Sequence, residues 1–330
     1  MSAPLSTVVP RPMLLGAEPG LQPATGSRLV GVGHAQPARV VTAHELGEPF
    51  GRTAEWIHTR TGIRSVRRLG AADDIVDLAT GAGHAALANA SLQAVDLVIT
   101  ASCSISAGAS EQIALRLAPR AARLAVNAAC SGFSYAVSTA DSLIRSGSAQ
   151  HVLVVAAEHM SGIIDPADLG TSIIFGDGAG AAVVGPALGS EAGIGPVVWG
   201  SDGANAALIA CRPDGLLSMA GREVFRWAVE TMPEIARTAC ERAGVDVAEI
   251  EVFVPHQANL RIVDAIARKL GLLDVVIASD VSESGNTSAA SIPIALSKLI
   301  ERREVRRGQL ALLIGFGAGL AYAAQVVVLP

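Results

Sequence analysis

The 330-residue chain is half hydrophobic and only 17% charged, with 34 glycines and few aromatic residues, so its core must be built mainly from Ala, Val, Leu and Ile. That composition suits parallel strands buried on both faces by helices. The formal net charge of -5 argues against a general nucleic-acid binder, and the four cysteines show no close-spaced pair of the metal-binding kind, which favours a reduced, cytoplasmic setting.

The N-terminal half begins with a Pro-, Ala- and Gly-rich stretch. Residues 1–27 lack the basic start and unbroken apolar segment of a secretory signal, and we predict a disordered extension. Apolar periodicity then predicts, in order, strand 28–33, a loop and helix over 42–57, helix 74–90, strand 95–100, a helix starting at 111–117, a strand and helix around residue 130, and strands 151–157 and 179–184.

The C-terminal half repeats this order. The pattern predicts helix 223–243, strand 252–254, helix 260–270, strand 275–279, helix 288–300 and strands 310–314 and 323–329. Segment 310–329 is long enough to span a membrane, but its three glycines and β-branched run favour two buried strands. We therefore predict two duplicated α/β halves, 28–190 and 191–330. When the two halves are aligned, the strand of Val98 corresponds to that of Val254, and the Cys130 turn corresponds to the Asn286 turn. The strand-to-helix turns of both halves should face one cleft.

Cys130 lies between an apolar strand-like run and an amphipathic pattern from Ser134 through Ile144, which places it at a helix N-terminus. Unpaired backbone NH groups and the helix dipole favour a thiolate there, so Cys130 is a candidate nucleophile. The alternative is a small buried hydrophobe, the commoner state of a free cysteine.

His256 directly follows a buried-looking strand and Pro255, and Asn286 lies in a turn. Taken alone, they read as a hydrogen-bonded structural histidine and a turn or helix-cap residue. With Cys130 they make a coherent site, in which a thiolate attacks a carbonyl while imidazole and carboxamide donate hydrogen bonds to the oxygen. Cysteine proteases use the same residue types, so the three alone do not separate acyl transfer to water from acyl transfer to carbon.

The flanking sequences resemble β-ketoacyl-[acyl-carrier-protein] synthase III. The resemblance covers about residues 28–329 and rests on the Cys130 stretch and four further segments. These are 56–64 (WIHTRTGIR), 173–182 (IIFGDGAGAA), 254–262 (VPHQANLRI) and 285–293 (GNTSAASIP).

The resemblance implies a thiolase fold in a layered αβαβα arrangement and a homodimer. It also implies decarboxylative Claisen condensation of an acyl thioester starter with malonyl-[acyl-carrier-protein], a reaction that primes fatty acid or polyketide biosynthesis. The family needs no metal or redox cofactor for this reaction. By family analogy, Cys130 takes the acyl group, and His256 and Asn286 stabilise the enolate formed as the malonyl group loses carbon dioxide. The backbone NH groups of Cys130 and Ala318 hold the thioester oxyanion, although the family usually has glycine where this chain has Ala318.

The resemblance also assigns Trp56, Asn259, Arg261 and Phe316 to substrate or carrier binding, with acyl-coenzyme A or an acyl-carrier protein as donor. In well-known members, the tryptophan matching Trp56 helps to hold the adenine of coenzyme A, with an arginine at the position of Leu169 and a threonine near Arg52. Leucine can neither stack nor pair with phosphate as a guanidinium does, which weakens the expected grip on coenzyme A.

Two further departures concern the starter. Ala107 stands where many relatives place a bulky aromatic that reaches the partner's acyl pocket, and segment 201–218, which supplies pocket wall, is shorter than in common members. We expect that the starter is not plain acetyl-coenzyme A. Instead, its acyl group is longer, branched or carried on a protein.

Two basic clusters could meet an acidic carrier protein. Arg261, Arg268 and Lys269 lie along one predicted helix, and a later cluster comprises Arg302, Arg303, Arg306 and Arg307. Basic runs are usually solvated faces, but complementary charge steers encounters between proteins. We favour Arg261, because it matches the family motif.

Three alternatives remain at this stage. The first is an acyltransferase on the same scaffold that moves the acyl group from Cys130 to an alcohol or amine, against which Asn286 speaks. The second is a catalytically silent subunit of a synthase heterodimer, which the intact Cys130, His256 and Asn286 disfavour. The third is a cysteine protease, which nothing beyond these three residues supports.

Overall fold

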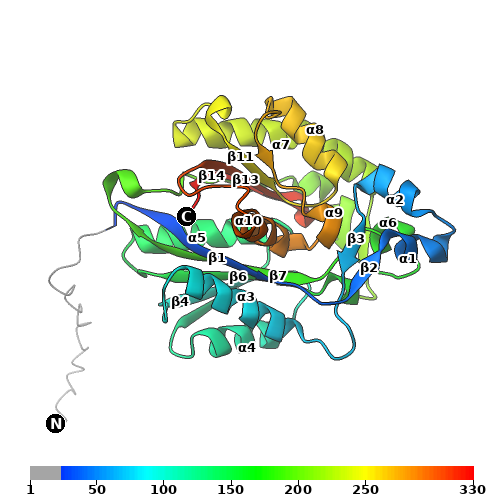
Figure 1. Ribbon diagram of the computed structural model, residues 1–330, viewed down its shortest axis with the longest axis horizontal. Coiled ribbons are helices and arrows are strands. Elements are labelled where there is room, and N and C mark those ends of the chain that lie inside the picture. The colour runs from blue at the N-terminus through cyan, green and yellow to red at the C-terminus, as the bar shows by residue number, and fades with distance from the viewer. Residues whose placement is uncertain (1–23) are drawn as a thin grey trace, which may run out of the picture.

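The computed structural model describes residues 24–330, and Figure 1 shows them as five alternating layers of helices and sheets. The first sheet has the order β1 (Gly26–Ala35), β7 (Gly178–Ala187), β6 (Val152–Glu158), β4 (Leu97–Ala101), β5 (Ala122–Val126). The second has the order β8 (Val198–Ser201), β14 (Ala321–Val328), β13 (Leu310–Phe316), β11 (Val252–Pro255), β12 (Val276–Ile277). Two small sheets pair β2 (Val40–Thr42) with β3 (Ser65–Arg67), and β9 (Ile209–Cys211) with β10 (Leu217–Met219).

The helices form the other three layers (Figure 1). Helices α5 (Gly132–Arg145) and α10 (Ser291–Glu301) lie between the sheets, α3 (Ile75–Asn89) and α4 (Ala107–Leu117) cover the first sheet, and α7 (Gly221–Ala243) and α8 (Leu260–Leu270) cover the second. Four shorter helices are α1 (Ala43–Gly47), α2 (Ala54–Thr61), α6 (Leu169–Ser172) and α9 (Val281–Ser284). The predicted αβαβα layering is therefore confirmed.

The two large sheets repeat one pairing pattern. Strand β4 runs parallel to β5 and β6, and β6, β7 and β1 pair antiparallel in turn. Strand β11 runs parallel to β12 and β13, and β13, β14 and β8 pair antiparallel in turn. This confirms the predicted duplication. The strand of Val98 in the first half corresponds to the strand of Val254 in the second half, as predicted. The boundary at residues 190 and 191 stays a prediction.

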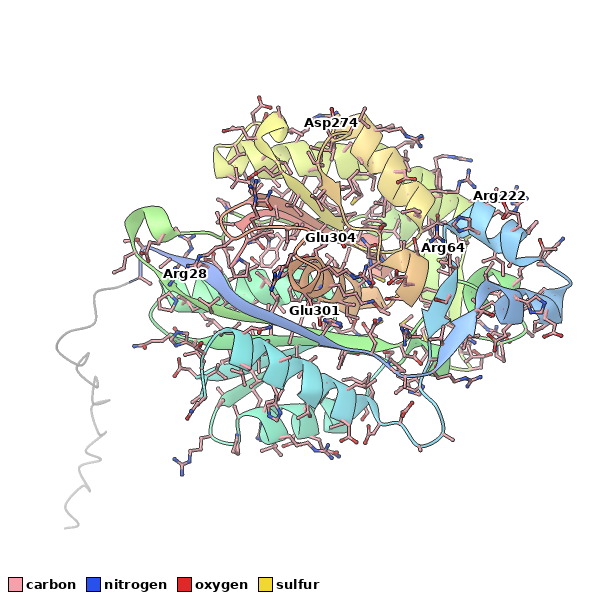
Figure 2. All side chains as sticks on the ribbon, viewed as in Figure 1. Arg28, Arg64, Arg222, Asp274, Glu301 and Glu304 are labelled. Atoms are coloured by element: carbon pink, nitrogen blue, oxygen red, sulfur yellow. The ribbon has the colours of Figure 1, made fainter. Side chains whose placement is uncertain are left out.

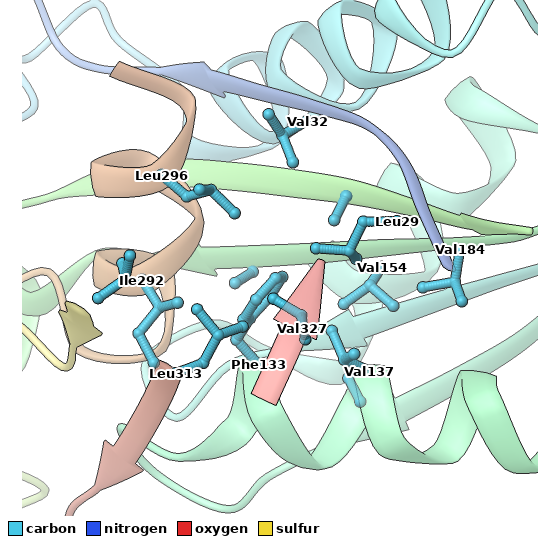
Figure 3. Close-up of a cluster of buried hydrophobic side chains, with 14 of the residues drawn as sticks. Leu29, Val32, Phe133, Val137, Val154, Val184, Ile292, Leu296, Leu313 and Val327 are labelled. Carbon is cyan, nitrogen blue, oxygen red and sulfur yellow. The ribbon is translucent and has the colours of Figure 1, made fainter. Parts of the chain in front are cut away.

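One apolar core joins the halves. Figure 3 shows Phe133 and Val137 from α5 and Ile292 and Leu296 from α10 packed between the two sheets. Capping side chains set the helix ends, as where Asp74 accepts a hydrogen bond from the backbone N–H of Val76 at the start of α3. Burial of both faces explains why the central strands read as apolar runs in the sequence.

The structure corrects several predicted boundaries. Residues 26 and 27, assigned to the extension, belong to β1, whereas residues 1–23 of that extension lie outside the described part. Helix α4 begins at residue 107 rather than 111, because the Ser106 side chain caps it by accepting from the N–H of Ala109. The strand expected over 275–279 is reduced to two residues. Segment 310–329 forms β13 and β14, and none of the helices within residues 24–330 is long and apolar enough to cross a membrane.

A nearly buried ion pair fixes the segment that leads to Asn286. Lys298 Nζ on α10 lies 2.6 Å from Asp280 Oδ1 and 2.9 Å from Ser284 Oγ, and the Lys298 and Asp280 side chains are 12% and 6% exposed. These contacts hold both ends of α9 against α10. The turn that carries Asn286 is therefore held from the central helical layer.

We expect Lys298→Met to lower the free energy of unfolding by about 3 kcal/mol, because it leaves the Asp280 carboxylate buried without its partner. Urea denaturation measures this change. The matched control is Arg302→Gln, which breaks an exposed pair with Glu283 and should cost less than about 1 kcal/mol. Equal losses in the two variants would contradict the structural role of Lys298.

Candidate active site

Two connected cavities lie between the halves. The inner cavity measures about 270 Å³ and contains Cys130, His256 and Asn286 in its wall. The outer cavity measures about 790 Å³ and contains Trp56, Asn259 and Arg261. The two cavities share a set of lining residues, which are Met219, Val224, Ala258 and Asn286. A ligand held in the outer cavity can therefore extend to the three polar side chains of the inner one.

Cys130 stands on a tight turn between β5 and α5. Ala129 before it has a φ of +48°, a left-handed conformation that costs about 1 kcal/mol for a residue with a side chain. On the other side, a Cβ added to Gly317 would lie 2.7 Å from Cys130 N and 3.0 Å from its Sγ. The chain therefore needs glycine at residue 317, where the second half touches the nucleophile.

The pKa of Cys130 differs from the sequence-based expectation. Burial raises the pKa of the thiol to about 12, because desolvation outweighs the neighbouring hydroxyl of Ser288, which favours the thiolate. Desolvation acts against the thiolate that the helix N-terminus favours, and the expected effect of the helix stays a prediction.

His256 follows β11 and is 2% exposed. Its Nδ1 lies 2.7 Å from Ser291 Oγ, which also accepts a hydrogen bond from the backbone N–H of Gln257 at 3.2 Å. Burial lowers the pKa of His256 to about 3, so the imidazole is neutral. If the Ser291 hydroxyl donates to Nδ1, the remaining ring proton sits on Nε2, and we assign this tautomer. The ring packs edge-on against Phe316, with centroids 5.2 Å apart.

Asn286 lies between α9 and the 3-10 helix Ser288–Ala290. Its backbone N–H donates to the Ile174 carbonyl at 2.9 Å, and its carbonyl accepts from the N–H of Gly176 at 3.0 Å. Its Oδ1 accepts from the N–H of Ser288 at 2.8 Å, so the NH₂ group remains as the donor that can face a ligand. The turns of Cys130 and Asn286 hold equivalent places in the two halves, as predicted. Cys130 follows β5 and Asn286 follows β12, and each of these is the parallel strand at the edge of its sheet.

A buried polar cluster lies behind Cys130. Glu158, at the end of β6, is fully buried, and its carboxylate accepts hydrogen bonds from Ser102 Oγ at 2.9 Å, from Ser104 Oγ and from the N–H of Ala289 at 3.2 Å. The Cys103 backbone N–H and thiol also donate to it, and the Cys103 Sγ lies 3.3 Å from Ser288 Oγ. This cluster, Ser102–Ser104 with Glu158 and Ser288, joins the two halves beneath the nucleophile.

The outer cavity is rich in cations. It is lined by five basic side chains and one acidic one, which are Arg60, Arg222, Arg226, Arg261, Lys269 and Glu230. Figure 2 shows Arg222 at the end of the molecule that carries α2, far from Glu301 and Glu304. Of the predicted basic residues, Arg261 and Lys269 reach this cavity. In the later cluster, Arg302 pairs with Glu283, and Arg307 lines a separate surface cavity.

Trp56 and Asn259 lie beside this basic surface. The guanidinium carbons of Arg52 and Arg60 lie 4.8 and 4.6 Å from the Trp56 ring centroid. Leu169 lines the same cavity. Asn259 caps α8 by accepting from the N–H of Arg261 at 2.9 Å, and it donates to the Arg60 carbonyl at 3.3 Å. Asn259 therefore has a structural role in joining α8 to α2.

The remaining predicted residues fall in two places. Phe316 and Ala318 line the inner cavity, as do residues 209–211, 215 and 217 of the predicted pocket-wall segment. Ala107 is exposed at the start of α4 and lines neither cavity of this chain. Its assignment to a partner's acyl pocket stays a prediction.

Sequence reasoning missed the residues that support the site: Cys103, Glu158, Gly317, Ser288 and Ser291. One signal was available, since Glu158 ends a strand that is otherwise apolar. Ser288 gave no such signal, since nothing in the local sequence reports its positive φ of +49°.

Comparison with known protein families gives two matches. Residues 124–203 match the model of 3-oxoacyl-[acyl-carrier-protein] synthase III, and residues 240–329 match that of the C-terminal part of the same synthase. The first match contains Cys130, and the second contains His256 and Asn286. The predicted resemblance is thus confirmed by an independent comparison.

Individual relatives agree. The beta-ketoacyl-[acyl-carrier-protein] synthase III 4 of Streptomyces coelicolor is 48% identical over 314 residues, which cover 92% of this chain and 99% of that protein. The synthase III of Mycobacteroides abscessus is 43% identical, with 92% and 94% covered. The crystal structure of the priming β-ketosynthase from the R1128 polyketide biosynthetic pathway superposes with a TM-score of 0.88 at 41% identity, covering 94% of this chain and 99% of the other. The thiolase-like fold is therefore confirmed. The chain belongs to the β-ketoacyl-[acyl-carrier-protein] synthase III family.

Proposed function

We propose that the protein condenses an acyl thioester starter with malonyl-[acyl-carrier-protein], with loss of carbon dioxide, and so primes fatty acid or polyketide biosynthesis. The observation that carries this proposal is the convergence of Cys130, His256 and Asn286 on one narrow, largely apolar cavity. The names of the relatives above support it, since they include β-ketoacyl synthases and a priming ketosynthase.

In the first half-reaction, Cys130 Sγ attacks the thioester carbonyl of the starter, and the thiol of the donor leaves. We assign the oxyanion to the backbone N–H groups of Cys130 and Ala318. Cys130 N lies at the contact with Gly317, and Ala318 is the next residue along the same cavity wall. Fixed backbone donors of this kind stabilise developing charge at no cost of reorganisation.

In the second half-reaction, the malonyl group loses carbon dioxide, and the resulting enolate carbon attacks the acyl group on Cys130. The Nε2–H of His256 and the NH₂ group of Asn286 donate hydrogen bonds to the enolate oxygen. A neutral imidazole suits this role, because it stays a donor over the whole physiological pH range. The apolar surroundings strengthen both hydrogen bonds and favour expulsion of the charged carboxylate as neutral carbon dioxide.

The starter is an acyl chain larger than acetyl. The inner cavity is several times the roughly 30 Å³ that a water molecule takes in the liquid, and much of its wall is apolar. The apolar side chains in that wall include Met160, Ile163, Phe175 and Leu217. A longer or branched chain fills such a cavity and gains about 0.8 kcal/mol per buried methylene.

The outer cavity receives the phosphopantetheine arm, and its cations meet an acidic carrier protein. Five basic side chains against one acidic side chain give a positive surface that steers a negative partner. No cofactor beyond these substrates is proposed.

Two copies of the chain associate through β5, an exposed edge strand of the first sheet on which Leu124 is 40% exposed.

The direct test is mass spectrometry after incubation with acetyl, branched and medium-chain thioesters, followed by malonyl-carrier protein. We expect an acyl adduct on Cys130, formed fastest with the larger donors, which discharges with carbon dioxide into a β-ketoacyl product. Cys130→Ser should form no stable thioester adduct. An adduct that ignores the malonyl group but discharges onto an alcohol or amine would instead identify an acyltransferase, and a strong preference for acetyl would overturn the proposed starter.

The neutral state of His256 predicts a pH effect on stability. The unfolded chain takes up a proton near pH 6.5, whereas the folded chain does so only near pH 3, so stability falls as the pH drops between these values. We expect the free energy of unfolding to fall by about 1.4 kcal/mol per pH unit between pH 6 and pH 4 relative to His256→Asn. Urea titrations of both proteins measure it, and parallel pH profiles would contradict a buried neutral imidazole.

Carrier docking predicts a charge effect. Arg261→Glu should raise the KM for malonyl-carrier protein about tenfold at low salt, and the difference should shrink at high salt because screening weakens the attraction. A short malonyl thioester without the carrier should show no such change. Arg307→Glu makes the same charge change away from the outer cavity and serves as the control. Equal effects of both variants would refute docking at this cavity.

A further inference from the structure

One wall of the inner cavity comes from a hairpin with a small sheet of its own. Strands β9 and β10 form this two-stranded sheet, in which the opposite residues are Cys211 with Leu217 and Ile209 with Met219. Side chains of directly opposite residues lie on the same face of a hairpin. All four of these residues line the inner cavity, so the proposed starter meets one face of the hairpin.

The contacts of this hairpin with the rest of the chain determine where it lies, because a two-stranded hairpin is only marginally stable in water. It rests on the segment after β6, from which Met160 and Ile163 line the same cavity. The backbone N–H of Leu217 donates to the Ile163 carbonyl at 2.7 Å. Leu217 and Met219 also pack against a buried cluster that includes Met160. Two walls of the cavity therefore meet along these contacts.

Arg212, in the turn of the hairpin, reaches from one wall to the other. Its Nη1 donates to Asp165 Oδ2 at 3.2 Å, and its Nη2 pairs with Asp214 inside the turn. Its backbone N–H donates to the Leu216 carbonyl at 2.7 Å, which closes the turn. Asp165 lies two residues after Ile163, so the ion pair joins the two walls just beyond their backbone hydrogen bond.

The ion pair lies at the surface end of this contact. The side chains of Arg212 and Asp165 are 41% and 28% exposed. The backbone N–H of Ala167 and the Arg212 guanidinium lower the pKa of the Asp165 carboxyl, so both partners are charged at neutral pH. A surface ion pair adds little to the stability of a whole protein. It matters more for a hairpin that opens locally, because a small free energy changes how often the hairpin leaves its place.

We propose that Arg212 is a positioning residue that sets the width of the acyl cavity by tying the hairpin to Asp165. This inference rests on the proposed function, because it takes the inner cavity as the place of the starter's acyl chain. With the pair intact, the hairpin stays on the Ile163 segment and the cavity keeps its volume of about 270 Å³. When the pair is broken, the hairpin moves away more often, and a bulkier acyl chain fits.

The test compares acylation of Cys130 by butyryl and decanoyl thioesters of N-acetylcysteamine, which carry neither a nucleotide nor a protein. Mass spectrometry follows the initial rates over a range of donor concentrations. In Arg212→Gln, the ratio of decanoyl to butyryl acylation should rise about fivefold, the upper range for a surface ion pair. The change should lie in the half-saturating concentration of the decanoyl donor, whereas the rate at saturation should stay within about twofold.

Three further variants sharpen the comparison. Asp165→Asn should change the ratio as Arg212→Gln does, and the double variant should add nothing further, because each change breaks the same pair. Arg212→Lys keeps a cation opposite Asp165 and should stay within about twofold of wild type. The matched control is Arg116→Gln, which breaks an exposed pair with Asp77 between α3 and α4 and should leave the ratio unchanged.

Hydrogen exchange of the Leu217 amide gives a readout that needs no substrate. This amide is protected by its bond to the Ile163 carbonyl, and its exchange reports how often the hairpin opens. We expect exchange about fivefold faster in Arg212→Gln and Asp165→Asn, and unchanged exchange in Arg116→Gln. Mass spectrometry of peptides that cover residues 209–219 measures it.

Equal changes for both donors, or an unchanged ratio, would overturn the proposal. Unchanged exchange of Leu217 would also overturn it, because the pair would then not hold the hairpin. If the wild-type protein forms no acyl adduct with any donor, the proposed function fails and the claim about the acyl chain fails with it. The exchange of Leu217 would still show whether Arg212 ties the hairpin to Asp165.

Discussion

Close backbone contact at Gly317 is the constraint on which the site depends. The nucleophile comes from the first half, and the loop that touches it comes from the second, with no room between them for a side chain at residue 317. The contact follows from the shared layer of α5 and α10, against which both sheets pack. Because the sheets repeat one pairing order, the turns after β5 and β12 meet across this layer. Each half alone would lack part of the site.

Desolvation then sets the chemistry. The burial that aligns Cys130, His256 and Asn286 raises the pKa of the thiol to about 12 and lowers that of the imidazole to about 3. Both groups are neutral at rest, which suits hydrogen-bond donation to an enolate but makes the thiol a poor nucleophile.

The two cavities divide recognition between them. The inner one has a largely apolar wall, which suits an apolar ligand group. The outer one is lined by five basic side chains and one acidic side chain, so its surface is positive. A positive outer surface therefore lies next to a largely apolar inner cavity.

By itself, the sequence determined the α/β class, the duplication and the three polar residues of the inner cavity. These features are encoded locally, since apolar periodicity reports burial within one element, and Cys130, His256 and Asn286 lie in recognisable motifs next to strands. It also identified the pocket-wall segment and the basic residue Arg261. Boundaries such as the start of α4 and the length of β12 were less accurate, because caps and edge pairing decide them.

Only the tertiary structure decided how burial shifts the pKa values of the site and which residues support it. The direction in which the pKa of the Cys130 thiol shifts depends on how much water is excluded from it, and no local motif reports this. The position at a helix N-terminus suggested a lowered pKa instead. Glu158 and Ala289 are 131 residues apart in the chain, and the hydrogen bond between them forms only when both halves pack together. Burial and contacts between residues that are far apart in the sequence therefore determine features of the site that local sequence patterns do not predict.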